Sequence, residues 1–165
     1  MNTLKNNAIA LALATSVGSL LVSGMAYAAD GKDYPGAHCM PDSSDPAFVV
    51  TPAGAIMNPS GNSSLTVICP GINDVGTPVT GVVTLVDANP DAPIRCTLES
   101  RARGGTVIGQ SIRQTPIGEG VRVLNFNTVV PNQVNSYFYY RCTLPPASQN
   151  PLRFSQILSY EFDEQ

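Results

Sequence analysis

The feature that most restricts the fold of this chain is an alternation of apolar and polar residues with a period of two. The alternation recurs in short segments between clusters of Pro, Gly and Asn. A period of two places every second side chain on one face of a β-strand. No segment shows a sustained helical period. The segments that we expect to form strands are 47–57 (broken near 52–54), 64–69, 79–87, 94–101, 106–114, 121–128, 137–144 and 152–162.

Turn residues separate these segments and limit how they can connect. Gly104 and Gly105 predict a tight hairpin because glycine tolerates positive φ, and Asn89-Pro90-Asp91 predicts a turn before residue 94. Short strands joined by such turns are typical of antiparallel sheets rather than of βαβ units. The pattern therefore predicts an all-β fold, an antiparallel β-sandwich of about seven to eight strands. An eight-stranded β-barrel is the alternative, since alternation does not distinguish a closed sheet from two packed sheets.

The N-terminus resembles a secretory leader. Lys5 precedes an apolar run over 8–22, and Ala26 and Ala28 are small residues at the two positions that a signal peptidase reads. We expect residues 1–28 to be a signal peptide of bacterial type, cleaved after Ala28. The apolar run is shorter than the roughly 20 residues of a membrane span, so we expect no span. Residues 29–165 then form a single secreted domain with a polar N-terminal lead over 29–45.

The sequence Arg-Cys-Thr-Leu occurs twice, at 95–98 and at 141–144. In both segments the cysteine lies in the apolar row of the expected strand, and the arginine lies in the polar row. Cysteines form disulfides in oxidising compartments, so we expect all four to be paired. Three pairings are open from the sequence alone; we favour Cys96–Cys142 in the core, which leaves Cys39–Cys69 anchoring the polar lead. A zinc site is disfavoured because the chain has no C-x-x-C pair.

Six short pieces between Gly36 and Glu164 carry a resemblance to a known group of proteins. The pieces are GAHCMP, SSLTVICP, VTLVDAN, IRCTLES, YYRCTLPP and LSYEFDE. In this order they resemble small secreted bacterial proteins that contain four cysteines and have no assigned activity. The resemblance implies a four-cysteine β-sandwich and carries over no catalytic or binding residue. Relatives often have a tryptophan in the middle of the chain, and this chain has none.

Charge and chemistry disfavour several classes of function. Nine Lys and Arg stand against twelve Asp and Glu, a formal net charge of −3, so we expect no nucleic-acid partner. The single histidine, His38, lies in the polar lead, where we expect a solvated side chain rather than a catalytic base. Glu99 and Glu161 fall on rows that we expect to be solvated, which is unfavourable for a catalytic acid. Residues 87–91 have the spacing of calcium ligands but lack the later Gly and Glu of an EF-hand, so we interpret them as a hairpin turn. We therefore favour a non-catalytic protein without metal or cofactor, and leave an enzymatic role open.

One outward row is the best candidate for a binding site. Tyr137, Tyr139 and Arg141 alternate with apolar residues on the expected strand over 137–144, so they share its polar face. Aromatic rings beside a guanidinium suit sugars, peptides or a partner protein. We expect these three residues to be exposed, and Phe138, Tyr140 and Cys142 to lie in the core.

These expectations favour a non-catalytic secreted module, periplasmic or extracellular, that binds an extracellular glycan or protein or has a structural role there. The alternative is a secreted enzyme inhibitor or hydrolase that acts through a surface loop such as the Pro-rich segment 145–150. Polymerisation by strand donation is disfavoured because the segment 29–38 is polar, whereas a donated strand needs alternating apolar residues.

Overall fold

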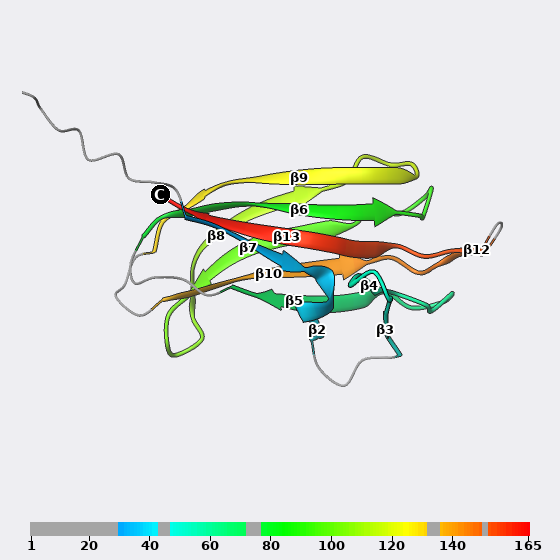
Figure 1. Cartoon of the computed structure of the whole chain (residues 1–165), viewed down its shortest axis with the longest axis horizontal. Coiled ribbons are helices and arrows are strands. Elements are labelled where there is room, and N and C mark those ends of the chain that lie inside the picture. Colours follow the sequence, from blue (N-terminus) through cyan, green and yellow to red (C-terminus); the bar gives the residue numbers. More distant parts are fainter. Residues whose placement is uncertain (1–29, 43–46, 72–76, 132–135, 150–151) are drawn as a thin grey trace, which may run out of the picture.

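The computed structural model describes the chain except for residues 1–29, 43–46, 72–76, 132–135 and 150–151. The expected signal peptide, residues 1–28, lies outside the described residues and stays a prediction. The described strands run mainly along the long axis of the molecule and form two antiparallel sheets (Figure 1).

The first sheet, which we call the β13 sheet, has the strand order β3-β4-β13-β6-β9, and β1 also pairs with β13. Its strands are β1 (Asp30–Pro35), β3 (Val49–Val50), β4 (Ile56–Met57), β6 (Val79–Asp87), β9 (Gly120–Val129) and β13 (Gln156–Glu164). The second sheet, the β10 sheet, has the order β2-β5-β10-β7-β8. Its strands are β2 (Met40–Pro41), β5 (Leu65–Pro70), β7 (Arg95–Arg101), β8 (Val107–Gln114) and β10 (Tyr137–Leu144).

Two smaller elements complete the described chain. A 3-10 turn, η1 (Gly36–His38), leads from β1 towards β2, and β11 (Ser148–Gln149) pairs with β12 (Leu152–Arg153) in a separate two-stranded ribbon. Eight of the described strands have six residues or more. The predicted all-β antiparallel sandwich is confirmed. The barrel alternative is wrong, because the described strands form two separate sheets rather than one closed sheet.

The core lies between the two sheets and is built from their inward rows. Phe138, Tyr140 and Cys142 are almost completely buried, as the alternation predicted. The hydroxyl of Tyr140 donates a hydrogen bond of 2.7 Å to the carbonyl oxygen of Glu161 on β13, which links the two sheets. Gly81 on β6 makes room for this contact, because a Cβ at that position would lie 1.9 Å from the Tyr140 hydroxyl.

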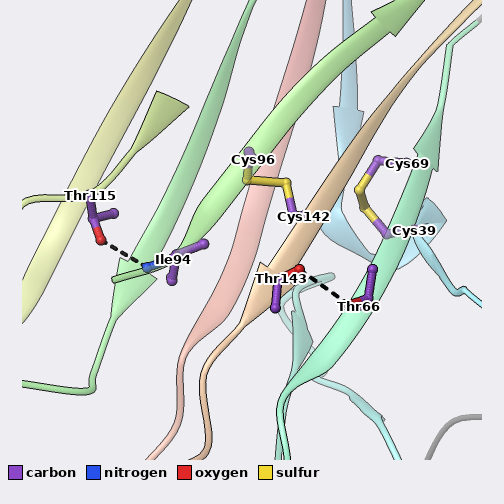
Figure 2. Close-up of a disulfide and its surroundings, with 8 residues drawn as sticks. All are labelled: Cys39, Thr66, Cys69, Ile94, Cys96, Thr115, Cys142 and Thr143. Carbon is purple, nitrogen blue, oxygen red and sulfur yellow. Dashed lines mark hydrogen bonds between the residues drawn. A yellow bond between two sulfur atoms is a disulfide. The ribbon is translucent and has the colours of Figure 1, made fainter. Parts of the chain in front are cut away.

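The two disulfides have the favoured pairing, Cys96–Cys142 and Cys39–Cys69 (Figure 2). Cys96 and Cys142 lie directly opposite each other on the neighbouring strands β7 and β10. The second disulfide corrects the expected role of the polar lead. Cys39 and Cys69 belong to the buried core, with exposed fractions of 2% and 0%, so this bond does not hold a loosely attached segment.

The polar lead also contains a strand that the alternation did not predict. All six residues of β1 pair with β13, and the ring of Tyr34 stacks on Tyr160 with 5.1 Å between centroids. Gly36 then brings the chain against β13, since a Cβ there would lie 2.1 Å from the Ile157 carbonyl oxygen. An edge strand has one side open to water and commonly carries charged residues and Pro, so its sequence lacks a clear apolar row.

One expected strand boundary and one expected turn need correction. The segment 152–162 is interrupted before β13, where Ser155 is fully buried and its hydroxyl accepts a hydrogen bond of 3.1 Å from the Ala88 amide. The turn at Asn89 is not a hairpin, because it connects β6 in one sheet to β7 in the other. The hairpin at Gly104 and Gly105 is confirmed: β7 and β8 are paired neighbours, and Gly105 has a φ of 84°.

Candidate functional site

The candidate site lies on the outward surface of the β10 sheet, which we call the β10 face. Residues that are directly opposite in paired antiparallel strands share a face, so the register defines its rows. From one end to the other, the rows are Thr66–Thr143–Arg95–Gln114, Met40–Ile68–Arg141–Thr97–Ile112, Pro70–Tyr139–Glu99–Gln110 and Tyr137–Arg101.

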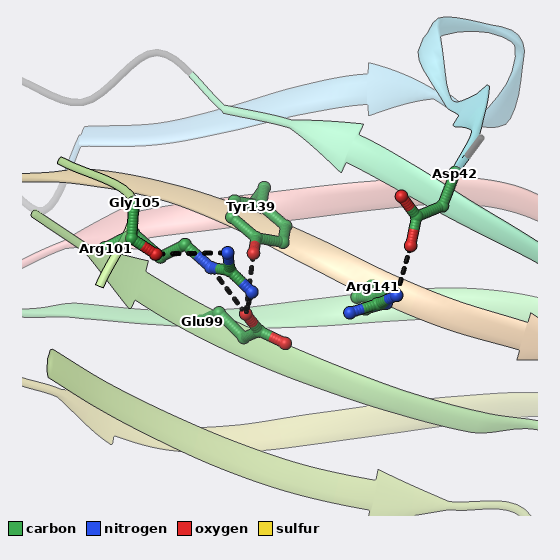
Figure 3. Close-up of polar contacts among 6 residues, drawn as sticks. All are labelled: Asp42, Glu99, Arg101, Gly105, Tyr139 and Arg141. Atoms are coloured by element: carbon green, nitrogen blue, oxygen red, sulfur yellow. Dashed lines mark hydrogen bonds and ion pairs between the residues drawn. The ribbon is translucent and has the colours of Figure 1, made fainter. Parts of the chain in front are cut away.

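Tyr139 is held within this face by polar contacts (Figure 3). Its hydroxyl donates a hydrogen bond of 2.6 Å to Oε2 of Glu99, the residue directly opposite on β7. The guanidinium carbon of Arg101 lies 5.4 Å from the centre of the Tyr139 ring. Only 7% of Tyr139 is exposed. The expectation that Tyr139 is a solvent-exposed ring is therefore wrong, because neighbouring side chains cover it.

Glu99 is also buried, which corrects the expectation of a solvated carboxylate. Its exposed fraction is 6%, and the same oxygen that accepts the Tyr139 hydroxyl accepts a hydrogen bond of 3.0 Å from Nε of Arg101. Arg101 donates a further hydrogen bond of 3.1 Å to the carbonyl oxygen of Gly105 in the β7–β8 turn. Buried charges in proteins are usually paired in this way, because an unpaired charge is costly to desolvate.

Burial raises the pKa of Tyr139, and the hydrogen bond and negative charge of Glu99 raise it further. The positive charge of Arg101 acts in the opposite direction but does not cancel these effects. Tyr139 therefore stays protonated at neutral pH and remains a hydrogen-bond donor. We call Tyr139, Glu99 and Arg101 the polar triad of the face.

Tyr137 is the exposed aromatic ring of the face. Its exposed fraction is 43%, and its ring stacks against that of Tyr139 with 6.1 Å between centroids and 25° between planes. Because the polar triad fixes Tyr139, one side of the Tyr137 ring rests on a rigid neighbour. A ligand would contact an aromatic ring whose position is largely set in advance, which lowers the entropic cost of binding.

Arg141 lies two residues beyond Tyr139 on β10 and is exposed. It forms an ion pair with Asp42, which follows β2 (Figure 3). Arg95 is exposed on β7, in the row next to that of Arg141. The structure thus brings the three predicted residues, Tyr137, Tyr139 and Arg141, onto one face but gives them different environments. Their role in binding stays a prediction.

The sequence reasoning missed Glu99, Arg101 and Asp42 as members of this face. For two of them a signal was available. In an antiparallel pair, the favoured Cys96–Cys142 register also places Glu99 opposite Tyr139 and Arg101 opposite Tyr137. For Asp42 no local signal exists, since its position depends on the backbone bond of 2.9 Å from its amide to the Thr66 carbonyl.

His38 and Asp87, which were considered from the sequence as a catalytic base and as a calcium ligand, do not belong to the β10 face. His38 is exposed in η1, with its ring 6.2 Å from that of Tyr34. Asp87 is buried and accepts hydrogen bonds from the Thr115 hydroxyl and the Asn89 amide, which supports a turn rather than a calcium loop. Within the described part of the chain, no group of three His, Cys, Asp or Glu is arranged to hold a metal ion.

The Pro-rich loop of the alternative function is partly buried at its start. Pro145 and Ala147 are buried, and their backbones are held by Asn58 Nδ2, 3.0 Å from the Pro145 carbonyl oxygen, and by the Ser60 carbonyl, 2.7 Å from the Ala147 amide. An inhibitory loop must project from the surface to reach an enzyme. In the described part of this loop, 145–149, Ser148 and Gln149 leave the buried stretch and form β11, which pairs with β12 outside the two sheets. An inhibitory or hydrolytic role of the loop stays a prediction.

Two hollows open elsewhere on the molecule. One, of about 510 Å³, is lined by nine residues near the start of β13: Met57, Val86, Asp87, Ala88, Glu119, Gly120, Arg153, Phe154 and Gln156. The other, of about 360 Å³, is lined by Tyr34, His38, Pro70, Gly71 and Tyr160. Neither of these two hollows is centred on the β10 face.

Comparison with protein-family models gives no match, and comparison with curated proteins gives none either. Solved structures match at a low level of identity. An arabinose-bound α-L-arabinofuranosidase is 12% identical with a TM-score of 0.50, covering 78% of this chain and 23% of that chain. A β-(1,4)-mannanase from Podospora anserina is 12% identical with a TM-score of 0.46, covering 82% of this chain and 28% of that chain. The CBM36-1 domain of a multidomain xylanase from the hindgut metagenome of Trinervitermes trinervoides is 12% identical with a TM-score of 0.45, covering 81% of this chain and 96% of that chain.

The chain therefore spans less than a third of the length of the arabinofuranosidase and of the mannanase. At this identity the first match shows a shared all-β fold and nothing about a ligand. Two disulfides are typical of proteins that fold in an oxidising compartment. Among the helices of the described chain, none has the length and apolar character needed to cross a membrane.

Proposed function

We propose that this domain is a non-catalytic secreted module that binds an extracellular glycan on its β10 face. The observation that carries the proposal is the exposed Tyr137 ring, stacked on a Tyr139 that is fixed by Glu99 and Arg101. The face of an aromatic ring is slightly negative and attracts the weakly positive C–H groups of a sugar ring. Preorganisation supports binding because little side-chain freedom is lost.

The shape of the face supports a glycan over a folded protein partner. Protein interfaces usually depend on central side chains that fill pockets, and the two hollows described above are centred elsewhere. A sugar chain needs only a ring to stack on and polar groups along its path. Thr97, Thr143 and Gln110 supply such groups beside Tyr137 and Arg141. The arabinose-bound enzyme shares only the fold, so the choice of a glycan rests on the face itself.

The test is a comparison of Tyr137→Ala with the wild-type chain on an array of extracellular glycans, followed by calorimetric titration of those retained. We expect Tyr137→Ala to weaken binding at least about tenfold, as is common for an exposed aromatic anchor. Val121→Ser, which changes an exposed residue of the other sheet, serves as the matched control and should bind as the wild type does. Retention of no glycan at all, or equal binding by Tyr137→Ala, would contradict the proposal.

A further inference from the structure

The positive charge of this acidic protein is concentrated on and beside the β10 face. Arg95, Arg101 and Arg141 project from its rows, and Arg103 is exposed in the turn that follows β7. The carboxylates of the same surface are already paired: Glu99 with Arg101, and Asp42 with Arg141. Among the described residues, no carboxylate pairs with Arg95 or Arg103. Counted over the described residues of this surface, two positive charges are therefore left without a paired carboxylate.

The remaining described arginines are engaged elsewhere. Arg113 donates hydrogen bonds to the Asn125 carbonyl oxygen and to the Asn127 side chain on β9. Arg122 donates to the carbonyl oxygens of Gly118 and Glu119, and Arg153 pairs with the Glu119 carboxylate. These contacts hold loops and the edge between the two sheets. Arg95 and Arg103 are thus the two arginines of the described chain left without a polar partner.

The outward surface of the β13 sheet has the opposite charge. Asp33 lies directly opposite Glu161, and Asp163 follows two residues later on the same face. The register places the three carboxylates close together, and the charges of Asp33 and Asp163 add to burial in raising the pKa of Glu161. Lys32 is not on this outward row and pairs with Glu164. The domain is therefore negative on one sheet surface and positive on the other.

We propose that the glycan bound by the β10 face is acidic, a chain carrying carboxylate or sulfate groups. This inference rests on the proposed function and names its ligand class. The row of Tyr137 and the row of Arg95 lie six residues apart along β10, about 20 Å at the rise of an antiparallel strand. A chain that stacks on Tyr137 at one end can therefore place acidic groups at Arg141 and Arg95, with Thr97 and Thr143 beside them. Arginine binds carboxylate and sulfate-like groups with paired N–H donors, which favours such a ligand.

The exported disulfide-bonded chain should be titrated with two pairs of probes that differ in charge alone. One pair is an oligogalacturonate and its methyl ester, and the other is dextran sulfate and dextran. We expect at least one acidic probe to bind at least tenfold more tightly than its neutral counterpart. Arg95→Gln and Arg103→Gln should reduce that ratio severalfold, whereas Arg153→Gln, which changes an arginine away from the face, should leave it unchanged.

The outcomes separate this inference from the proposed function. If neutral and acidic probes bind equally and Tyr137→Ala still abolishes binding, the β10 face binds glycans but the inference about acidity is overturned. It is also overturned if neither acidic probe binds, or if polyglutamate binds as tightly as the acidic glycans. A second copy of the chain could instead place its acidic β13 sheet against the positive β10 face. Sedimentation at low and high salt tests this possibility, and dimerisation that is lost at high salt would overturn the inference.

Discussion

Replacement of Glu99 tests whether the polar triad is structural. In Glu99→Ala the hydroxyl of Tyr139 loses its acceptor while the ring remains buried. An unsatisfied buried hydroxyl costs about 1–3 kcal/mol. The lost pair with Arg101 adds less, about 1 kcal/mol at most, because Arg101 is 27% exposed and partly screened by solvent. We expect a total loss of about 1–4 kcal/mol in the free energy of unfolding.

A double-mutant cycle isolates the hydrogen bond. Tyr139→Phe alone removes the donor and leaves Glu99 paired with Arg101, so it should cost only about 1–2 kcal/mol. The double variant has no Tyr139 hydroxyl, so it avoids the cost of the unsatisfied hydroxyl that Glu99→Ala alone creates. The two effects should therefore be non-additive, with a coupling of about 1–2 kcal/mol. Urea denaturation followed by far-UV circular dichroism measures all four free energies.

Thr97→Ala is the matched control, since Thr97 lies on the same strand and the same face two residues away. It should change the free energy of unfolding by about 0.5 kcal/mol or less. Additive effects in the cycle, or a loss for Glu99→Ala no larger than that of the control, would refute the reasoning. Glu99 would then be the solvated carboxylate that the sequence pattern predicted.

Three further changes test the rest of the structure. Gly81→Ala should lower stability by about 1–3 kcal/mol, measured in urea, because its methyl group would displace the Tyr140 hydroxyl and meet the Glu161 carbonyl at 2.3 Å. Glu161→Gln should raise the free energy of unfolding at pH 7 but not at pH 3. The raised pKa of Glu161 means that its charged form, present above that pKa, is unfavourable in the folded state. At pH 3 the residue is neutral in both the folded and the unfolded state, so the substitution removes no charge. Replacing either disulfide by two alanines should lower the free energy of unfolding by a similar amount, about 4 kcal/mol from chain entropy with some added loss of packing. If the loss for Cys39 and Cys69 were only half as large as that for Cys96 and Cys142, the polar lead would not be part of the core.

The central strands could be predicted from the sequence because each has one buried face. On β6 the exposed fraction alternates strictly from Val79 to Asp87, and the inward row of β10 includes Phe138, Tyr140 and Cys142 as expected. The alternation favoured the observed cysteine pairing among the three possible ones, since both Cys96 and Cys142 lie in apolar rows. For these elements the local pattern and the tertiary environment agree, so that the sequence reports the burial directly.

The sequence pattern did not predict strand β1 or the burial of Glu99, because tertiary contacts override the local pattern at both places. β1 is polar because it is an edge strand, and it is recognised as a strand only by its pairing with β13. Glu99 is buried although it lies on an outward row, because Tyr139 and Arg101 from the same face close over it. For Glu99, alternation gives the direction of the side chain correctly. What it does not give is which neighbours that side chain meets.

The distribution of charge could not be obtained from the sequence for a related reason. The net charge of −3 is an average over the chain, whereas a bound ligand responds to charges within a Debye length, about 8 Å at physiological salt. Packed sheets lie about 10 Å apart, and outward side chains add to the separation. The carboxylates of Asp33 and Glu161 are thus largely screened from a ligand at Arg95. Which charged row belongs to which sheet depends on the topology, in which the consecutive strands β6 and β7 enter different sheets. An acidic average is therefore compatible with an acidic glycan on the β10 face, because the net charge of the chain does not report the local charge of that surface.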